Sequence, residues 1–494
     1  MSRRIYKMMI LAMLIGHLQP VIAQEKINYT LEDIISRAKS NSPAALRAET
    51  QRENRYWQYR FFQSDYNPQL RFQGLIPGYN QSVTQVVQPD GTIEFREVEQ
   101  NLVELGLGLE QNIAATGGII SVNTATNRFD NFRSLPGDFQ TRYSGIPVNV
   151  RLVQPIFAFN DLKWNKKIEP LRYEESKKTY VEEMENISRI ATNLFFNYLL
   201  AQVRYEIAFK NKNNTEEIFR IENGRYNIGT TTEDQLLQVE LRVLEAEQNL
   251  ASARLDQESS ALEIRSFIGL NETVDFNLIL PDDIPQFIVD VDQAIDLAFQ
   301  NRADAVAFAR QKIEAEAEVA RARGSRFNMN LEASYGYNNA AFTFWDIFSD
   351  PNQQALVNLR LGVPILDWGR NKARMGIATA NQKLVDYTIE QEIINFEQEV
   401  FVQVKNFQQL KDRIEISKKA DEVADKRYEI SRQRYLSGKV DITNLNIAQT
   451  EKDSNKERYI ASLRDYWTAY YELRQLTLYD FESQQLLYIA EVEE

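Results

Sequence analysis

The sequence has no cysteine and only one histidine, His17, which lies near its start. Disulfides and thiolate metal sites are therefore excluded, and imidazole is available for neither acid–base chemistry nor zinc or iron ligation in the body of the chain. Carboxylate-only catalysis and calcium binding remain open. We expect no catalytic residue, no metal site, no cofactor and no enzyme activity.

The chain also lacks an apolar run long enough for a transmembrane helix. Its richest internal run, Leu194–Phe209, is interrupted by Arg204 and Glu206. A helix needs about 20 predominantly apolar residues to cross a bilayer, so this run is too short. If the protein enters a membrane, it does so by another structure.

The remaining apolar run lies at the start of the chain. Residues 8–16 follow three cations and lead to a small residue, Ala23. This order predicts a secretory signal peptide over residues 1–23. No cysteine follows it, so we do not expect a lipoprotein anchor.

Basic residues are fewer than acidic ones, 57 against 70. The net charge is −13, and it becomes −16 when the three cations of the predicted signal peptide, at positions 3, 4 and 7, are removed. A general nucleic-acid binder needs the opposite sign, so we expect no nucleic-acid partner.

One pattern occurs twice in the chain. VNLRLGVPIL, from Val357, alternates apolar and polar residues as a strand with two different faces does, and VNVRLVQPIF, from Val148, repeats it. Asn149 and Arg151 take the positions of Asn358 and Arg360 on the polar face. The two halves of the chain are therefore an internal duplication.

A long heptad pattern follows each of these strands. It predicts a helix of roughly 65 residues, about 100 Å long, which no compact domain can hold. The two helices end at RYNIG, Arg225–Gly229, and RYLSG, Arg434–Gly438. The seam positions are Met184, Ile187, Ala191, Leu194, Tyr198, Ala201 and Tyr205 in the first half, and Ile389, Ile393, Phe396, Val400, Gln403, Phe407, Leu410 and Ile414 in the second.

These signals divide the chain as follows. The first repeat spans 24–280, with a helix, strands within 67–157, a long helix at 161–223 and a return helix at 233–268. A linker follows at 281–289. The second repeat spans 290–478, with a helix, strands within 329–364, a long helix at 370–436 and a return helix at 442–478, and 479–494 is an acidic, peripheral tail.

The strands are long enough, at about nine residues, to cross a bilayer when tilted. We expect Gln81–Val98 to form a polar loop or short hairpin. The plan then gives four strands per protomer, or six if the additional alternating pair at Leu102–Thr126 joins the same sheet. Too few strands are present to close a barrel alone, so several protomers are needed.

The signal peptide, the duplicated plan and the turns RYNIGTTTEDQL and RYLSGKVDITNL together resemble the TolC-like outer membrane efflux proteins. The resemblance implies a mainly α fold with β structure: coiled-coil hairpins in a long-helix α-barrel, and a transmembrane β-barrel closed by three protomers. It further implies an outer membrane channel of a Gram-negative-type envelope, with its helical part in the periplasm. Its partners would be outer membrane lipid, a periplasmic adaptor (membrane fusion) protein and an inner-membrane transporter, in tripartite efflux or type I secretion.

The same resemblance assigns the entrance to the two turns. Gly229 and Gly438, with Arg225 and Arg434, correspond to tips that contact the adaptor. Tyr435 takes the position of a tyrosine that helps to hold the entrance closed, and Tyr226 is its counterpart in the first half.

The family pattern places an acidic residue six positions after each glycine, in a cation-selective ring. This chain has Gln235 and Asn444 there. The nearby acids Glu233, Asp234 and Asp441 could supply a negative potential instead.

Each of these residues also has a structural interpretation. The glycines suit helix C-caps, acids favour a helix N-terminus, and the tyrosines could simply pack. As a whole-chain alternative, a soluble periplasmic coiled-coil adaptor or scaffold explains the helices and leader but not the duplicated strands. A carboxylate-dependent glycosidase has no localised carboxylate pair to support it.

Overall fold

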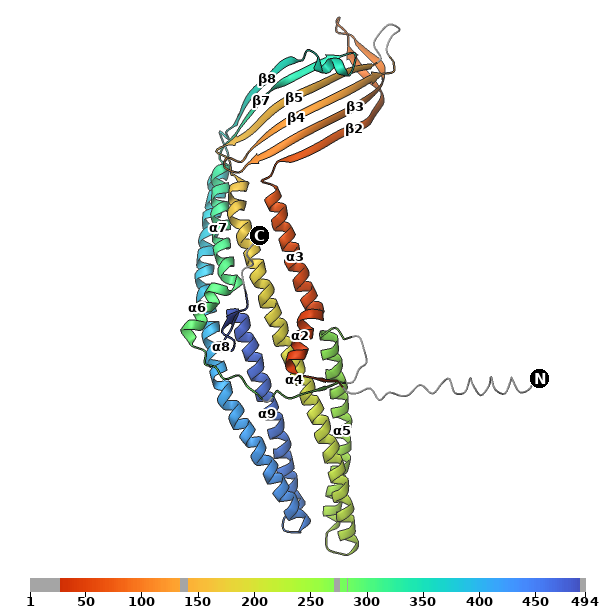
Figure 1. Cartoon of the computed structure of the whole chain (residues 1–494), viewed down its shortest axis with the longest axis vertical. Coiled ribbons are helices and arrows are strands. Elements are labelled where there is room, and N and C mark those ends of the chain that lie inside the picture. Colours follow the sequence, from red (N-terminus) through yellow and green to blue (C-terminus); the bar gives the residue numbers. More distant parts are fainter. Residues whose placement is uncertain (1–26, 134–140, 271–275, 282, 489–494) are drawn as a thin grey trace, which may run out of the picture. The chain divides into compact units, whose positions relative to one another are not determined.

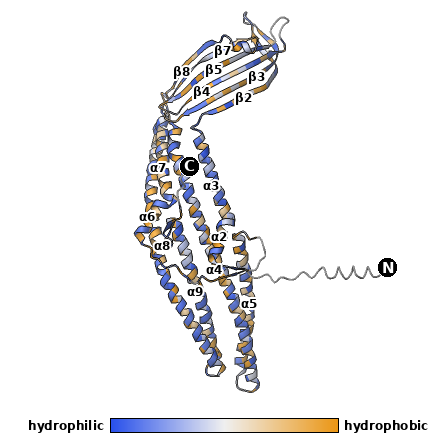
Figure 2. Ribbon diagram, in the orientation of Figure 1, coloured by the Kyte–Doolittle hydropathy of each residue, from blue (hydrophilic) through white to orange (hydrophobic). Residues whose placement is uncertain are grey.

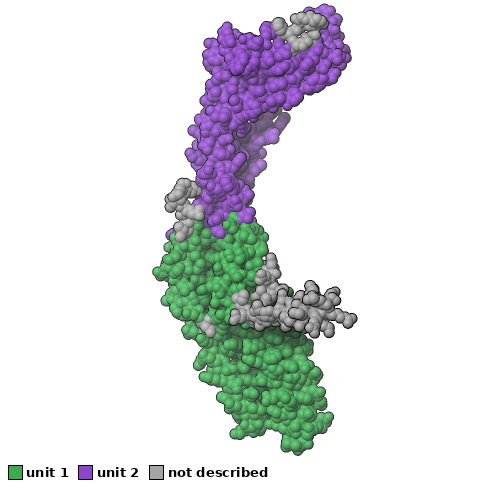
Figure 3. Space-filling view, turned by 45° about the vertical axis from the view of Figure 1, so that its right-hand side comes forward, with its two compact units in different colours: residues 1–49, 181–298, 400–494 green, residues 50–180, 299–399 purple. Residues whose placement is uncertain are grey.

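The computed structural model describes residues 27–133, 141–270, 276–281 and 283–488, so the predicted signal peptide lies outside the described residues. The chain divides into two compact units. One comprises residues 1–49, 181–298 and 400–494, and the other residues 50–180 and 299–399 (Figure 3).

The second unit contains a six-stranded antiparallel sheet (Figure 1). Its strands run in the spatial order β2-β3-β4-β5-β7-β8. Their bounds are Gln69–Val87, Ile93–Ile113, Gly118–Asn131, Thr141–Ile156, Asn328–Ala341 and Asn352–Gly362.

The register of the sheet separates an apolar face from a polar face, and hydropathy alternates along the strands (Figure 2). Residues directly opposite each other in an antiparallel pair point to the same face. One row across all six strands is Leu70, Leu109, Val122, Val150, Tyr335 and Ala355, and the row beside it is Arg71, Gly108, Asn123, Asn149, Gly336 and Gln354. We call the sides that carry these rows the apolar face and the polar face. Arg151 and Arg360 lie on the polar face, as the sequence predicts.

Of the two structures expected for Gln81–Val98, a loop or a short hairpin, the structure has the hairpin. The stretch forms the outer halves of β2 and β3, which pair up to Val87 opposite Ile93. The turn itself is only Gln88–Thr92, where the Gln88 N–H donates to the Thr92 carbonyl at 2.8 Å. Charged residues obscure the alternation in this stretch. The pair at Leu102–Thr126 belongs to the same sheet, as parts of β3 and β4, so the sheet has six strands rather than four.

The helices also follow the duplication. In the first half they are α2 (Leu31–Asn41), α3 (Pro43–Ser64), α4 (Asp161–Asn227) and α5 (Glu233–Phe267). In the second half they are α6 (Val291–Asn301), α7 (Ala303–Gly324), α8 (Arg370–Leu436) and α9 (Ile442–Thr477). The short parallel pair β1 (Ile27–Tyr29) and β6 (Phe276–Leu278) joins the start of the first repeat to its end.

The single helix expected near the start is in fact two. Thr30 caps α2 with a capping box, in which its side chain and that of Asp33 each accept a hydrogen bond from the other's backbone N–H. The helix stops at Ser42 because Pro43 disfavours helical geometry in the residue before it and suits the first turn of the next helix.

The core of the first unit lies along the predicted heptad seams. Ile187, Ala191 and Tyr198 of α4 are buried, as are Val400 and Phe407 of α8. From α9, Leu463 and Ile460 are buried as well. These positions confirm that the heptad pattern marks helix packing.

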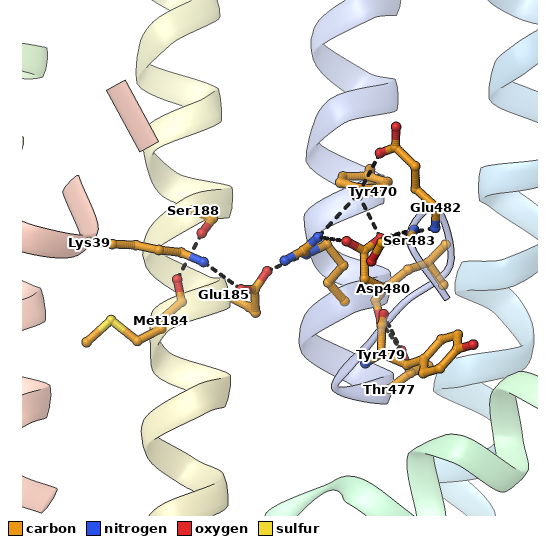
Figure 4. A network of polar contacts seen from close by, with 12 residues as sticks. Lys39, Met184, Glu185, Ser188, Tyr470, Thr477, Tyr479, Asp480, Glu482 and Ser483 are labelled. Atoms are coloured by element: carbon orange, nitrogen blue, oxygen red, sulfur yellow. Dashed lines mark hydrogen bonds and ion pairs between the residues drawn. The ribbon is translucent and has the colours of Figure 1, made fainter. Parts of the chain in front are cut away.

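An ion-pair network ties the chain end to this core (Figure 4). The buried carboxylate of Glu185 on α4 accepts hydrogen bonds from Lys39 of α2 at 2.6 Å and from Arg474 of α9 at 2.8 Å. Arg474 also pairs with Asp480 at 2.6 Å. The start of the tail is therefore not peripheral, because β9 (Tyr479–Asp480) and Phe481 pack against the core. Residues 482–486, which include β10 (Gln485–Leu486), are exposed as a peripheral tail would be.

Among the residues that the structure describes, no helix combines the length and the apolar character needed to cross a bilayer.

Candidate functional site

The two turns that end α4 and α8 share one geometry. Gly229 and Gly438 have φ of 73° and 70°, in the left-handed region that glycine adopts without strain. In each turn the residue after the glycine donates its N–H to the carbonyl of the arginine five residues before: Thr230 to Arg225 at 2.9 Å, and Lys439 to Arg434 at 2.8 Å. This is the Schellman arrangement that ends a helix.

The return helices begin with capping side chains at the positions where the family pattern has acids. Thr232 and Gln235 form a capping box at the start of α5. Asp441 caps α9 and accepts hydrogen bonds from the backbone and the side-chain amide of Asn444 at 2.9 and 2.7 Å. Glu233 and Asp234 are exposed in the first turn of α5. Gln235 and Asn444 are thus engaged in local capping.

A buried polar group lies close to these turns, on α4 and α8. Glu222 of α4 and Tyr435 of α8 are only 5% and 2% exposed. The Tyr435 hydroxyl donates to the Glu222 carboxylate at 2.6 Å, and Arg225 pairs with the same carboxylate at 2.8 Å. The Arg225 guanidinium also lies 5.5 Å from the centre of the Tyr435 ring. We call these three residues the tip cluster.

The tip cluster fixes the protonation of its members. Burial raises the pKa of Glu222, but hydrogen bonds from Tyr435, Thr231 and Arg225 outweigh it, so the net pKa is lowered and the carboxylate stays charged. Burial, followed by the neighbouring carboxylate, raises the pKa of the Tyr435 hydroxyl, which therefore remains a donor.

Apolar side chains from four helices surround the tip cluster. The buried ones are Val239 of α5, Tyr428 of α8, and Ile442 and Leu445 of α9, and Phe219 and Ile218 of α4 pack against them. The two helical hairpins, α4–α5 and α8–α9, are therefore joined to each other near their tips within one protomer.

Further polar contacts join the hairpins along the same line. Asn211 of α4 donates to Asp453 of α9 at 2.8 Å, and Arg204 pairs with Glu457 at 2.7 Å. Separation of the hairpins would have to break these contacts as well as the tip cluster.

The structure distinguishes the two tyrosines that the sequence treats as equivalents. Tyr435 is buried in the tip cluster, whereas Tyr226 is 41% exposed. Arg225 likewise points to Glu222, while its counterpart Arg434 is exposed. The duplicated turns thus differ in the roles of their matching residues.

Sequence reasoning missed Glu222, although a signal for it exists. Glu222 follows Ile218 by four residues and Phe219 by three, so it lies on the apolar face of α4. An acid on such a face needs a buried partner, because an unpaired buried charge is costly.

Apolar stripes remain uncovered on two helices. The leucines that give α5 its heptad pattern are not buried as seam residues: their exposed fractions run from 52% to 67%. A similar stripe of exposed apolar side chains runs along α8. The residues are Leu237, Leu241, Leu244, Leu255 and Leu262 on α5, and Ile377, Leu384, Tyr387, Ile394, Phe401, Ile416, Val423 and Ile430 on α8.

The family model described as "outer membrane efflux protein" matches residues 34–270 and 289–477, which is most of the chain. No match was found among curated proteins.

Solved outer membrane channels have a similar fold. The CmeC channel of Campylobacter jejuni superposes with a TM-score of 0.66 at 13% identity, over 92% of this chain and 87% of that one. VceC of Vibrio cholerae gives 0.60 at 14% identity, over 90% and 95% of the two chains. The open state of the MtrE channel of Neisseria gonorrhoeae gives 0.60 at 15% identity, over 90% and 88%.

These comparisons give no support to a soluble scaffold, and the relatives they identify are channels rather than enzymes. The match covers most of both repeats, and between them it leaves out a stretch around the linker. The chain belongs to the outer membrane efflux protein family, whose members are outer membrane channels with a helical tunnel in the periplasm.

Proposed function

We propose that this chain forms a homotrimeric channel that receives substrates from an inner-membrane transporter through a periplasmic adaptor and releases them outside the cell. The observation that carries the proposal is the pair of uncovered surfaces on one protomer. The sheet presents an apolar face that continues across six strands, and α5 and α8 carry apolar stripes at heptad spacing. Lipid suits the first surface, and neighbouring protomers suit the second.

The entrance of this channel would be at the two tips. The tip cluster holds the hairpins of one protomer together by a charged, buried hydrogen bond, the strong kind. Opening would then require the loss of the bond between Tyr435 and Glu222. The exposed turns at Gly229 and Gly438, with Arg434, would be the surface that an adaptor contacts.

The exposed acids at the starts of α5 and α9 would give the entrance its ion preference. Three copies of Glu233, Asp234 and Asp441 would place a ring of carboxylates around the pore, and such rings attract cations. Gln235 and Asn444 contribute no charge and serve as capping residues.

The test is ion selectivity in planar bilayers. The variant E233Q/D234N/D441N removes three charges per protomer and keeps the cap of α9, because Asn caps a helix about as well as Asp. We expect its cation preference, measured from the reversal potential in a salt gradient, to fall well below that of the unmodified channel.

The matched control is E247Q/D412N/E415Q, which removes the same number of charges from exposed positions along the helices. It should keep the original preference. Unchanged selectivity in the first variant would contradict the acidic ring and leave the constriction to other residues.

A further inference from the structure

The two edge strands of the sheet, β2 and β8, are left without a strand partner in the described part of the protomer. β8 is exposed along its whole length, Asn352–Gly362. It contains no lysine and no proline, the residues that soluble proteins use to protect a sheet edge. β2 has one proline, Pro77, in 19 residues. Both edges are therefore suited to pair with another strand.

The apolar face reaches both of these edges. Leu70 and Phe72 on β2 are 71% and 66% exposed, and Val357 and Leu359 on β8 are 72% and 61% exposed. In hydrocarbon, each unpaired backbone group at such an edge costs several kcal/mol, so an open edge does not persist there. The edges must be closed by another chain if the whole apolar face lies in lipid.

The strand directions allow this closure. Neighbouring strands alternate in direction across the sheet, so β2 and β8, the first and last of six, run in opposite directions. A β8 strand of one copy can therefore pair antiparallel with β2 of the next, as every other pair in the sheet does.

We propose that all six strands of each protomer enter the membrane barrel, with β8 of one protomer paired to β2 of the next, so that three copies close an eighteen-stranded barrel. This inference rests on the trimer of the proposed function and adds the edge that joins its members. Barrels with 16–18 strands leave an aqueous channel, so the polar face would line a wide lumen.

The competing arrangement excludes the β2–β3 hairpin from the barrel and closes the barrel at β4. It would break a register that runs without interruption from Gln100 opposite Asn131 to Ile113 opposite Gly118. It would also leave Phe72 and Leu107, which lie opposite each other on the apolar face, in water.

Cysteine cross-linking tests the proposal directly, because the chain has no cysteine of its own. Gln73→Cys or Asn80→Cys on β2 is combined with a cysteine at one of four β8 positions: Gln354, Leu356, Asn358 or Arg360. All lie on the polar face, so each combination samples a different register. Strand neighbours meet the distance that a disulfide requires.

After mild oxidation of the full-length protein in detergent, we expect at least one combination to convert most of the chain into covalent dimers and trimers on non-reducing gels. Reductant should reverse this. Ser121→Cys or Asn123→Cys on β4, paired with the same β8 cysteines, should give none, because β4 has a partner on each side.

The particle mass in detergent, measured on the same samples, distinguishes failure of the eighteen-stranded barrel from failure of the trimer itself. A trimer that links through β4, or that links through no β2 combination, would overturn the eighteen-stranded barrel and leave the trimer intact. A protein that is monomeric in detergent would overturn the proposed function as well.

Discussion

Glu222 places a carboxylate in the apolar interior between two helical hairpins, where a charge is stable only with partners. Tyr435 and Arg225 supply them. The hydrogen bond from Tyr435 therefore joins the two hairpins strongly. Loss of that partner would leave a buried carboxylate poorly satisfied, so we expect the entrance to have two distinct states.

Tyr435→Phe should weaken this junction. The change removes one hydrogen bond to a charged group, worth about 1.5–3 kcal/mol, and retains the ring and its packing. We expect a higher basal single-channel conductance in planar bilayers, because the closed arrangement loses stability.

Tyr226→Phe is the matched control, since the same atom is removed from the exposed tyrosine of the other turn. It should leave the conductance unchanged. Equal effects of the two substitutions would show that the tip cluster does not hold the entrance.

Acid should open the same junction. The pKa of Glu222 is lowered from its ordinary value of 4.5 because the hydrogen bonds from its partners outweigh the effect of burial. A group with a lowered pKa stabilises the folded arrangement above its unfolded pKa, and this contribution is lost as the pH falls through the folded pKa.

Conductance should therefore stay constant from about pH 7 to pH 5 and rise only below about pH 4.5, as follows from the direction of that shift. Glu222→Gln removes the titrating group and should make this acid response much smaller. An equally large response in the variant would assign the effect to other carboxylates.

Among the elements, the long helices are the best predicted. The predicted bounds of the long helix in the second half, 370–436, coincide with those of α8. Its heptad pattern has no proline, and the Schellman turn at Gly438 marks its end, so the local signals agree. The outer halves of β2 and β3 were predicted only as a loop or short hairpin, because polar and charged residues separate the few apolar ones there and a strand depends on its partner.

Of the hydrogen-bonded pair in the tip cluster, Tyr435 could be predicted from the sequence and Glu222 was missed. The sequence places Tyr435 near the turn, but its partner Glu222 is 213 positions earlier in the chain. Nothing local pairs them, because only the packing of α4 against α8 brings the two side chains together. The leucines of α5 also stand at heptad spacing in the sequence, but the sequence cannot distinguish a seam buried within one protomer from one left for a neighbour.

The α5 stripe leads to a prediction about assembly. Leu241, Leu244 and Leu255 are exposed in the protomer, so their joint replacement by glutamine should change the stability of the protomer only slightly. It should nevertheless weaken the trimer, because these side chains would be buried between neighbours. Particle mass in detergent over a range of dilutions measures this.

The control replaces Glu240, Glu247 and Glu263 of the same helix by glutamine, which alters exposed positions that are not in the heptad register of the leucines. Its trimer should persist at dilutions where the leucine variant dissociates. If the leucine variant stays as trimeric as the control, the stripe faces something other than a neighbouring protomer.

In the whole molecule, a single chain has the sheet and the long helices of a channel, but it leaves surfaces of both uncovered. The sheet has two open edges, and the helices have uncovered apolar stripes. Identical copies related by rotation around one axis would cover both the sheet edges and the stripes when the ring closes. The six-stranded sheet then determines the width of the barrel, and the tips determine its entrance.

The central claim is that this chain is a trimeric outer membrane channel, and electron microscopy of the detergent-extracted protein tests it most directly. The account predicts particles with threefold symmetry, a single barrel to which each protomer contributes six strands, and helices about 100 Å long, from the rise per residue of α4 and α8. A protein released from the envelope without detergent, as single protomers with no barrel, would contradict it.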